Sequence, residues 1–471
     1  MPRRESATRY AIRMPDLLSP YVPSLDSLKL GLLNLGLLNL GVLALAAVWS
    51  GAADARINAN AKIAVDRIEN TNPAGQRLLL PYAFSTESMG FTVGLGGMIK
   101  GFYQEQMTIG GTVFGGPENH GAALGLWDFR FPQSRRLFIT ALGMMGYFPR
   151  QLAYAAPTNV YWPADQPRPG SNDSSPDAVL QSSGVSNWWE IKLEYALPIG
   201  ATRHIGLTRY QLAEGMLISE PSGGRQWNPL ESGASVLMLR QYNQYQTFEF
   251  ENDTLSGALH AFELGLLYDN TDFPLNPSLG SKQYIGVHHD PAWLESRDKW
   301  SFLEIEASKY FSLGASRYAL QRVIAINGWT AYSPSWNLEY NENGGSRVAH
   351  APPYLEGANL GGFYRMRGYD QYRFHDKAAV YAAAEYRHTL RWNPLRGVSW
   401  LQFLASDWLQ LVAYAEGGRV APEYTARTLF SDWKSDVGLA LRGMFGGVVV
   451  RLDWGHSTEG NNVWAMVGHP F

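Results

Sequence analysis

Two short segments of the sequence carry residue types that could do chemistry. The first, His288-His289-Asp290, holds three side chains of the kinds that bind metal ions. In a strand, adjacent side chains point to opposite faces, so both histidines would rarely bind one ion. We therefore predict no metal site, and we place this segment at a strand end near the outer surface.

The second segment, Gly455-His456-Ser457 with Glu459 close behind it, resembles a fragment of a hydrolase site. The chain has no Gly-x-Ser-x-Gly motif, which argues against the common esterase arrangement. A phospholipase site assembled across several strands is the alternative. The glycine-rich segment 94–97 lacks the strand, loop and helix context of a phosphate loop. We predict no catalytic residue and no cofactor, and hence a protein that is not an enzyme.

Composition narrows the class of protein. The 471 residues carry a net charge of −3, so no basic surface suggests a nucleic-acid partner. Charged residues make up 17% and aromatic residues 13%, with 48 glycines, which does not suit a disordered chain. Abundant Trp and Tyr are typical of proteins at a membrane boundary. The absence of cysteine suits an oxidising compartment.

The N-terminus has the pattern of a secretory signal, predicted over residues 1–55. An apolar run at 30–49 is followed by the small-residue cleavage site Ala53-Asp54-Ala55. An inner-membrane anchor is the alternative, disfavoured by Asn34 and Asn39 within the run. No later apolar run approaches the ~18 residues of a membrane helix. Within the signal, the apolar run is preceded by basic residues, namely Arg3, Arg4, Arg9, Arg13 and Lys29.

Alternation at period two indicates strands in the rest of the chain. In 189–195, Trp, Ile, Leu and Tyr share one face and Glu190, Lys192 and Glu194 share the other. A soluble barrel turns such charges outward, whereas a membrane barrel turns them into the lumen. The signal sequence, the aromatic residues and the terminal Phe471 favour the membrane. We predict an all-β fold, a transmembrane antiparallel β-barrel of about 16 strands over 82–471, after a short periplasmic tail or plug at 56–81.

The clearest strands and connections lie in the second half of the chain. We predict periplasmic turns at 312–316 and 446–447, and outer loops at 156–187, 217–234 and 331–378. A final strand from about 462 to 471 would put Phe471 on one face with Val463 and His469. The predicted strands are 258–268, 282–289, 300–311, 317–330, 379–392, 408–420, 435–445, 447–456 and 462–471.

The longest loop contains a recognisable motif, Leu360-Gly361-Gly362-Phe363-Tyr364-Arg365-Met366-Arg367-Gly368-Tyr369. It resembles the signature of the BamA/TamA superfamily (bacterial surface antigen barrels), in which a hydrophobic-Arg-Gly-aromatic tetrad tips the sixth outer loop. The resemblance covers 258–471 well and 82–257 loosely. The family's periplasmic POTRA domains have no counterpart here. Asp269-Asn270-Thr271-Asp272 also resembles the family's turn after a middle strand.

The resemblance implies an inward-folded outer loop whose arginine contacts acidic residues on the barrel wall. The arginine would be Arg367, and its partners Glu385 and Glu416. Met366 stands where the family has Val or Leu, and Glu416 where it usually has Asp. A terminal aromatic such as Phe471 resembles the assembly signal of outer-membrane barrels.

The resemblance further implies an outer-membrane protein of a Gram-negative-type bacterium that assists protein insertion into, or translocation across, that membrane. Its partners would be membrane lipid, unfolded outer-membrane or secreted proteins, and periplasmic proteins that replace the missing domains. A porin-like channel and a structural or surface-display barrel are the alternatives. A loop held in the lumen by Arg367 would argue against an open pore.

Overall fold

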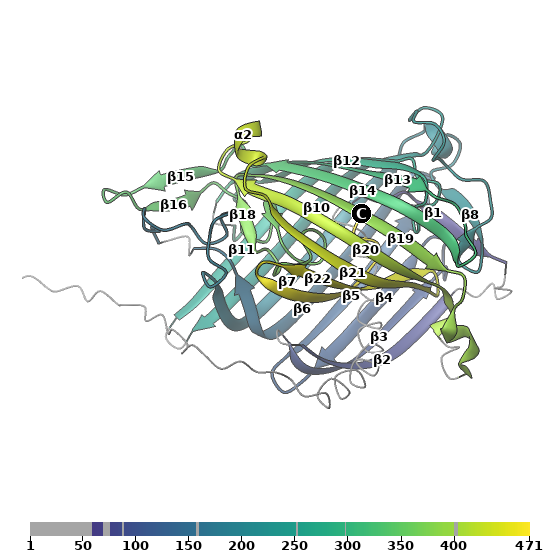
Figure 1. The fold of residues 1–471 in the computed structure, drawn as a ribbon, viewed down its shortest axis with the longest axis horizontal. Helices are drawn as coiled ribbons and strands as arrows, with labels where there is room; N and C mark the ends of the chain where they lie inside the picture. Colours follow the sequence, from purple (N-terminus) through teal and green to yellow (C-terminus); the bar gives the residue numbers. More distant parts are fainter. Residues whose placement is uncertain are drawn as a thin grey trace, which may run out of the picture.

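The computed structural model describes residues 59–68, 76–86, 89–156, 160–250, 253–296, 298–399 and 404–471. The predicted signal sequence at 1–55 lies outside these residues. One large sheet curls around a central lumen (Figure 1). Its strands are β2 (Gln76–Thr86), β3 (Gly90–Lys100), β4 (Thr108–Gly115), β5 (His120–Arg130), β6 (Leu137–Ala153), β7 (Leu180–Ala196), β10 (Ala234–Phe250), β11 (Asp253–Asp269), β12 (Gly280–Asp290), β13 (Trp300–Ser312), β14 (Ala319–Tyr332), β19 (Ala378–Leu390), β20 (Ser406–Ala421), β21 (Lys434–Phe445), β22 (Val448–Ser457) and β23 (Gly460–Val467).

The sheet has 16 strands in chain order, and each neighbouring pair is antiparallel, which confirms the predicted fold class. The order begins at β2 and ends at β23, and no pairing joins these two strands among the described residues. The described sheet therefore ends in two edges, one on β2 and one on β23. No helix in the described part of the chain is long and apolar enough to cross a membrane.

Smaller elements lie in the connections between the barrel strands. Within the described residues, helical structure is confined to short turns, so the connections hold no helical domain. These elements are β1 (Ile63–Arg67), η1 (Gly200–Thr202), β8 (Thr208–Ala213), β9 (Met216–Leu217), β15 (Asn337–Tyr340), β16 (Ser346–Ala349), β17 (Ala358–Leu360), β18 (Phe374–Asp376), η2 (Pro394–Gly397) and α2 (Ala426–Leu429).

Connections alternate between the two ends of an antiparallel sheet. We call the end with loop 333–377 the outer end, and the end with the turns 313–318 and 446–447 the inner end. The connection 197–233 between β7 and β10 falls at the inner end by this alternation. The prediction of an outer loop at 217–234 was therefore wrong. It arose because the strands of the first half alternate less regularly than those of the second.

Two predicted boundaries also differ from the structure. The first barrel strand begins at Gln76, so residues 76–81 belong to the sheet and not to the N-terminal segment. The last strand ends at Val467, because Gly468 adopts a φ of 77° and turns the chain away from the edge. Phe471 thus lies outside the strand in which its role as an assembly signal was predicted, and its ring is buried.

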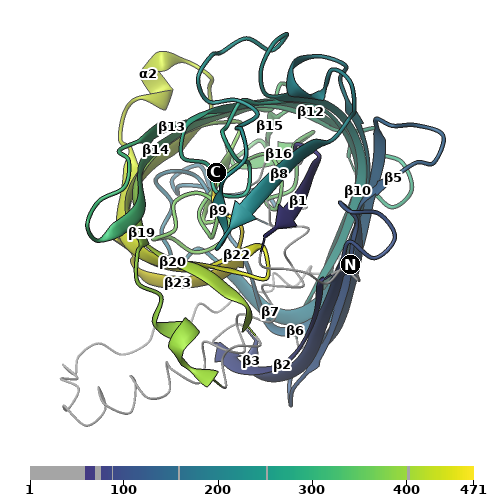
Figure 2. The same cartoon turned by 90° about the vertical axis from the view of Figure 1, so that its right-hand side faces the viewer.

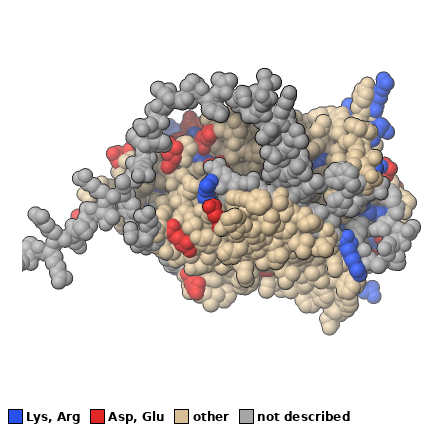
Figure 3. Space-filling model, turned by 90° about the horizontal axis from the view of Figure 1, so that it is seen from below, with Lys and Arg blue, Asp and Glu red and all other residues tan. Residues whose placement is uncertain are grey.

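The two faces of the barrel have the polarity of a membrane protein. In β7, Trp189 is 46% exposed on the outside, whereas Glu190 is 5% exposed on the inside. The same arrangement holds around the barrel: apolar side chains point outward and charged side chains point inward, as contact with lipid requires. Figure 3 shows a broad face of uncharged side chains, with charged ones mainly toward its ends. Outward apolar residues include Val93, Val113, Leu124, Leu193, Leu239, Leu264, Ile285, Ile305, Ile326, Leu411, Leu439 and Val463.

This polarity makes the effect of an outward charge predictable. Leu264 of β11 is 55% exposed and has the luminal Glu263 beside it in sequence. We expect Leu264→Arg to lower the free energy of unfolding in lipid vesicles by about 2–4 kcal/mol, because its cation would face hydrocarbon. Leu264→Met is the matched control and should change little. Equal stability of the two variants in urea titrations would mean that this face does not contact lipid.

A small sheet lies inside the inner end of the barrel. β1 pairs in parallel with β8, which pairs with β9, and the end-on view shows these strands within the ring of barrel strands (Figure 2). β8 and β9 come from the connection 197–233, which folds back toward the lumen. We call residues 59–68 with β8 and β9 the inner plug. Residues 59–68 thus lie in the mouth of the barrel.

Candidate functional site

The outer loop 333–377 reaches the lumen through two hairpins. β15 pairs with β16 at the outer end, and β17 pairs with β18 at the base of the loop tip. The tip, residues 361–372, closes on itself through backbone hydrogen bonds. Gly361 N donates to Arg365 O (3.1 Å) and Gly362 N donates to Tyr369 O (3.2 Å). The motif therefore forms one compact turn that the hairpin β17–β18 holds at both ends.

Four residues of the tip, Gly361, Gly362, Met366 and Tyr372, adopt left-handed backbone conformations. Gly361 and Gly362 have φ values of 107° and 103°, and a Cβ at Gly361 would lie 2.3 Å from Asp370 O. Both positions thus require glycine. Met366 has a φ of 59° although it is not glycine. It is fully buried, so packing around its side chain offsets the backbone strain.

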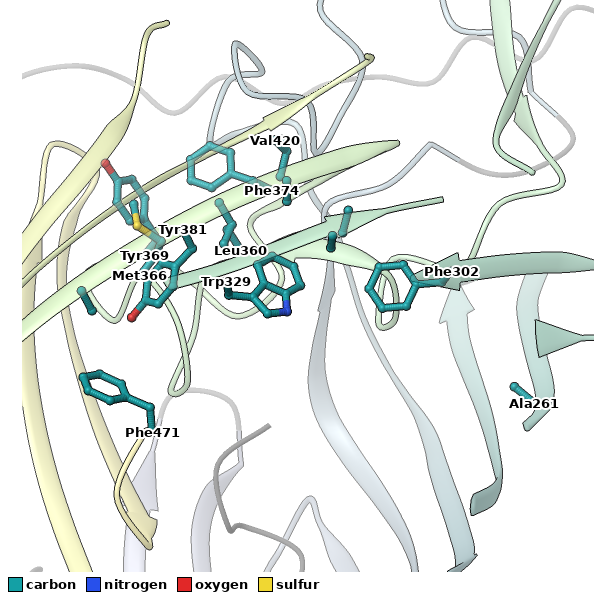
Figure 4. Packing of buried hydrophobic residues seen from close by; sticks show 14 of the residues in the cluster. Ala261, Phe302, Trp329, Leu360, Met366, Tyr369, Phe374, Tyr381, Val420 and Phe471 are labelled. Carbon is teal, nitrogen blue, oxygen red and sulfur yellow. The ribbon is translucent and has the colours of Figure 1, made fainter. Parts of the chain in front are cut away.

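Apolar side chains of the tip pack into one cluster with the barrel wall. Met366 and Tyr369 lie beside Tyr381 of β19, with Leu360 and Phe374 close by (Figure 4). All five are at most 1% exposed. This packing holds the tip against β19 and β20, and it places Arg367 in the middle of the wall.

Arg367 is wholly buried and contacts three carboxylates. Its Nε donates to Glu416 Oε1 (3.1 Å), its Nη2 to Glu385 Oε1 (2.9 Å) and its Nη1 to Asp453 Oδ1 (3.2 Å). The guanidinium also stacks 3.5 Å from the Tyr414 ring. Burial alone would lower the pKa of Arg367, but Glu416, Asp453 and Glu385 outweigh it and raise that pKa well above its ordinary value. The arginine therefore remains charged.

The structure brings both predicted partners, Glu385 and Glu416, to Arg367. It adds Asp453 of β22, which was not predicted as a partner of Arg367. These carboxylates come from β19, β20 and β22, so one loop side chain ties together three strands of the C-terminal part of the wall. We call Arg367 with Glu385, Glu416 and Asp453 the arginine lock.

Close backbone approach completes the arginine lock. Gly368 O accepts hydrogen bonds from Ser457 Oγ (2.7 Å) and Asn462 Nδ2 (3.3 Å), and Arg367 O accepts one from Trp464 Nε1 (2.8 Å). A Cβ on Gly455 would lie 2.6 Å from Arg367 O, so glycine is required where the loop crosses β22. The tip therefore contacts the last two strands of the sheet directly.

Three further arginines surround the arginine lock. Arg387 and Arg442 each donate to Glu385, at 2.8 and 2.7 Å, and Arg451 pairs with Asp453. Within the described residues, Glu416 pairs with a single cation, Arg367. Of the three carboxylates, Glu416 thus depends most on the loop for a compensating positive charge.

The C-terminal segment packs beneath this network. Arg387 Nη2 donates to Phe471 O (3.3 Å), and its guanidinium lies 5.3 Å from the Phe471 ring. Burial, with Arg387 and Arg442, holds the pKa of His469 well below its ordinary value. Neutral His469 can therefore accept a hydrogen bond from Arg442 Nη1 at 2.9 Å. The final residues line the lumen and do not extend the edge of the sheet.

The inner plug is held by ion pairs to opposite sides of the barrel. Lys62 Nζ lies 2.6 Å from both Asp128 of β5 and Glu194 of β7. On the other side, Arg67 forms a bidentate pair with Asp407 of β20, at 3.0 and 2.6 Å. Burial alone would lower the pKa of Lys62, but the two carboxylates outweigh it and raise that pKa. Lys62 is therefore charged, and its ion pairs together with those of Arg67 anchor the plug across the lumen.

The hydrolase-like segment does not form a site. His456 is exposed on the outside of β22 and bonds to Asn461, whereas Ser457 faces inward and donates to Gly368. Their side chains point to opposite faces and cannot act on one substrate. His288 and His289 likewise lie on opposite faces of β12, as predicted.

No protein-family profile matches the sequence. No curated protein matches it either. Several solved structures are similar to the chain. BamA from Haemophilus ducreyi lacking POTRA domains 1–3 shares 11% identity at a TM-score of 0.43, covering 85% of this chain and 72% of that one.

CdiB from Escherichia coli shares 11% identity at a TM-score of 0.48, covering 85% of this chain. CdiB from Acinetobacter baumannii shares 8% at 0.41, covering 82%. The chain spans 61% and 59% of these two CdiB proteins. At such identities, the assignment of residues to the site rests on the geometry of this chain alone.

Proposed function

We propose that this chain is an outer-membrane barrel of the BamA/TamA type that assists the insertion of proteins into the outer membrane or their translocation across it. The observation that carries the proposal is the arginine lock. The Met-Arg-Gly-Tyr tetrad of the outer loop lies deep in the lumen, where Arg367 donates hydrogen bonds to Glu385, Glu416 and Asp453. The motif and its acidic partners were both expected from the resemblance to that superfamily.

The sheet edges support an insertion role. β2 and β23 are the ends of the strand order, and nothing pairs them in the described chain. An unpaired strand edge in lipid leaves backbone groups that require a partner. An incoming strand of a client protein would supply those partners by adding to the edge. Because the loop tip touches β22 and β23, the state of the loop can influence the last edge of the sheet.

The porin-like alternative is less well supported. The outer loop occupies the lumen from one end and the inner plug from the other. A cavity of about 160 Å³ remains between the inner plug and the C-terminal segment, lined in part by Lys192, Glu194 and His469. Each obstruction narrows the path through the lumen, so a fully open channel would need both to move. The charged lumen suits either role and does not discriminate between them.

The test is the folding of a small, urea-unfolded barrel protein into liposomes with and without the purified mature chain. Insertion activity predicts faster folding when the chain is present, with little ion conductance through the same liposomes. Absence of acceleration together with steady conductance would overturn the proposal and favour the channel. Absence of both would favour a structural or surface-display barrel.

A further inference from the structure

A second polar cluster lies on the inner wall, apart from the arginine lock. Glu263 of β11, His288 of β12 and Glu304 of β13 each offer one ligand atom, and these atoms lie within 4.8 Å of one another. The three side chains are 0%, 2% and 5% exposed. Glu263 and His288 are direct cross-strand partners. The site is therefore built on three adjacent strands, which hold its geometry more firmly than loops would.

Each ligand is oriented by a second hydrogen bond. Arg240 Nη1 lies 3.0 Å from Glu263 Oε2, and Trp329 Nε1 donates to Glu304 Oε2 at 2.8 Å. Both Oε1 atoms turn toward His288 Nε2, at 3.6 and 3.2 Å. Outer hydrogen bonds of this kind fix metal-binding side chains in place.

The histidine nitrogen that faces the carboxylates can carry either a proton or a metal ion. Nδ1 of His288 lies 3.1 Å from Tyr242 OH, so the ring can donate there and turn the Nε2 lone pair inward. A lone pair facing two carboxylate oxygens is repulsive unless a proton or a metal ion lies between them. Two carboxylates and one imidazole are a ligand set for Zn²⁺ or Mn²⁺. Ca²⁺ requires six to eight oxygen ligands, which this set does not supply.

The wall around the site is rich in carboxylates. Besides the ligands Glu263 and Glu304 it carries Glu190, which pairs with Arg240, and Glu306, which pairs with Arg365. A buried imidazole that faces two carboxylates in such a wall is a favourable place for a cation.

From these observations we propose that Glu263, His288 and Glu304 form a binding site for a divalent transition-metal ion on the luminal wall. The bound ion would join β11, β12 and β13 beneath the outer loop. The sequence argument against a metal at His288-His289 considered both histidines on one ion. It does not exclude one histidine with carboxylates from neighbouring strands. The proposal is independent of the insertion role.

The experiment titrates Zn²⁺ into chelator-treated protein in detergent, purified with a tag that contains no histidine. Calorimetry should give one Zn²⁺ per chain, and the melting temperature should rise with Zn²⁺ because the ion binds the folded state. His288→Ala and Glu304→Gln should each weaken binding at least tenfold. His289→Ala, one residue along and outside the barrel, should bind as the wild type does.

Two results would overturn the proposal. One is no saturable Zn²⁺ binding by the wild type. The other is equal affinity in the wild type and Glu304→Gln, a variant that keeps the side-chain shape and serves if His288→Ala does not fold. Loss of binding in His289→Ala as well would point to surface histidines and count against the site. Displacement of Zn²⁺ by equimolar Mg²⁺ would exclude the transition-metal class.

Discussion

Replacing Arg367 with alanine should lower the free energy of unfolding of the barrel by about 3–5 kcal/mol, the range measured when one partner of a buried ion pair is removed. The cost arises mainly at Glu416. Glu385 keeps Arg387 and Arg442, and Asp453 keeps Arg451, but Glu416 loses its cation. A buried carboxylate with only hydrogen bonds from neutral groups is poorly compensated. Urea titration of the folded barrel in lipid vesicles measures the effect.

Arg347→Ala is the matched control for this variant. Arg347 also belongs to the outer loop and also pairs with a glutamate, Glu339, but these side chains are 38% and 36% exposed. Such a pair contributes about 0–1 kcal/mol. The double variant Arg367→Met with Glu416→Met should recover part of the loss, because it removes both buried charges together. If Arg367→Ala were no more destabilising than Arg347→Ala, the arginine lock would not hold the loop.

Reversing the charge at Lys62 should open the inner end of the barrel. Lys62→Glu would place a third carboxylate within reach of Asp128 and Glu194. At present two ion pairs, each with an N···O distance of 2.6 Å, hold the inner plug there. Like charges about 4 Å apart at an effective dielectric constant of about 20 repel by about 4 kcal/mol. We expect residues 59–68 to leave the lumen and the conductance of single barrels in planar bilayers to rise severalfold.

Two variants show whether such a rise comes from the plug. Arg209→Glu makes the same change of charge on β8, where Arg209 pairs with Glu105 at a more exposed position. It should leave the conductance near that of the wild type. Adding Glu194→Lys to Lys62→Glu restores an opposite-charge pair and should close the barrel again. An unchanged conductance in Lys62→Glu would mean that residues 59–68 do not obstruct the pore.

The arginine lock was partly predictable from sequence because its central parts are local. The tetrad identifies Arg367, and the alternation in β19 and β20 turns Glu385 and Glu416 to the lumen. Asp453 and Arg442 were harder to connect with it. Their contacts depend on register across β20, β21 and β22, which no single strand reveals.

The inner plug and the C-terminal segment escaped prediction for different reasons. β1 has five residues and pairs in parallel with β8, about 145 positions away, so its partner leaves no local pattern. Alternation places Phe471 on one face with Val463 only while the strand continues. Gly468 ends the strand by its left-handed backbone, and the ring turns into the lumen. Glycine near a strand end is the one signal that could have indicated this.

The most direct test of the central claim is the rate at which an unfolded small barrel folds into liposomes that contain Arg367→Ala, compared with Arg347→Ala, at equal amounts of folded protein. If the arginine lock supports insertion, Arg347→Ala should accelerate folding as the wild type does, and Arg367→Ala should leave the rate near that of empty liposomes. Equal acceleration by the two variants would contradict the claim.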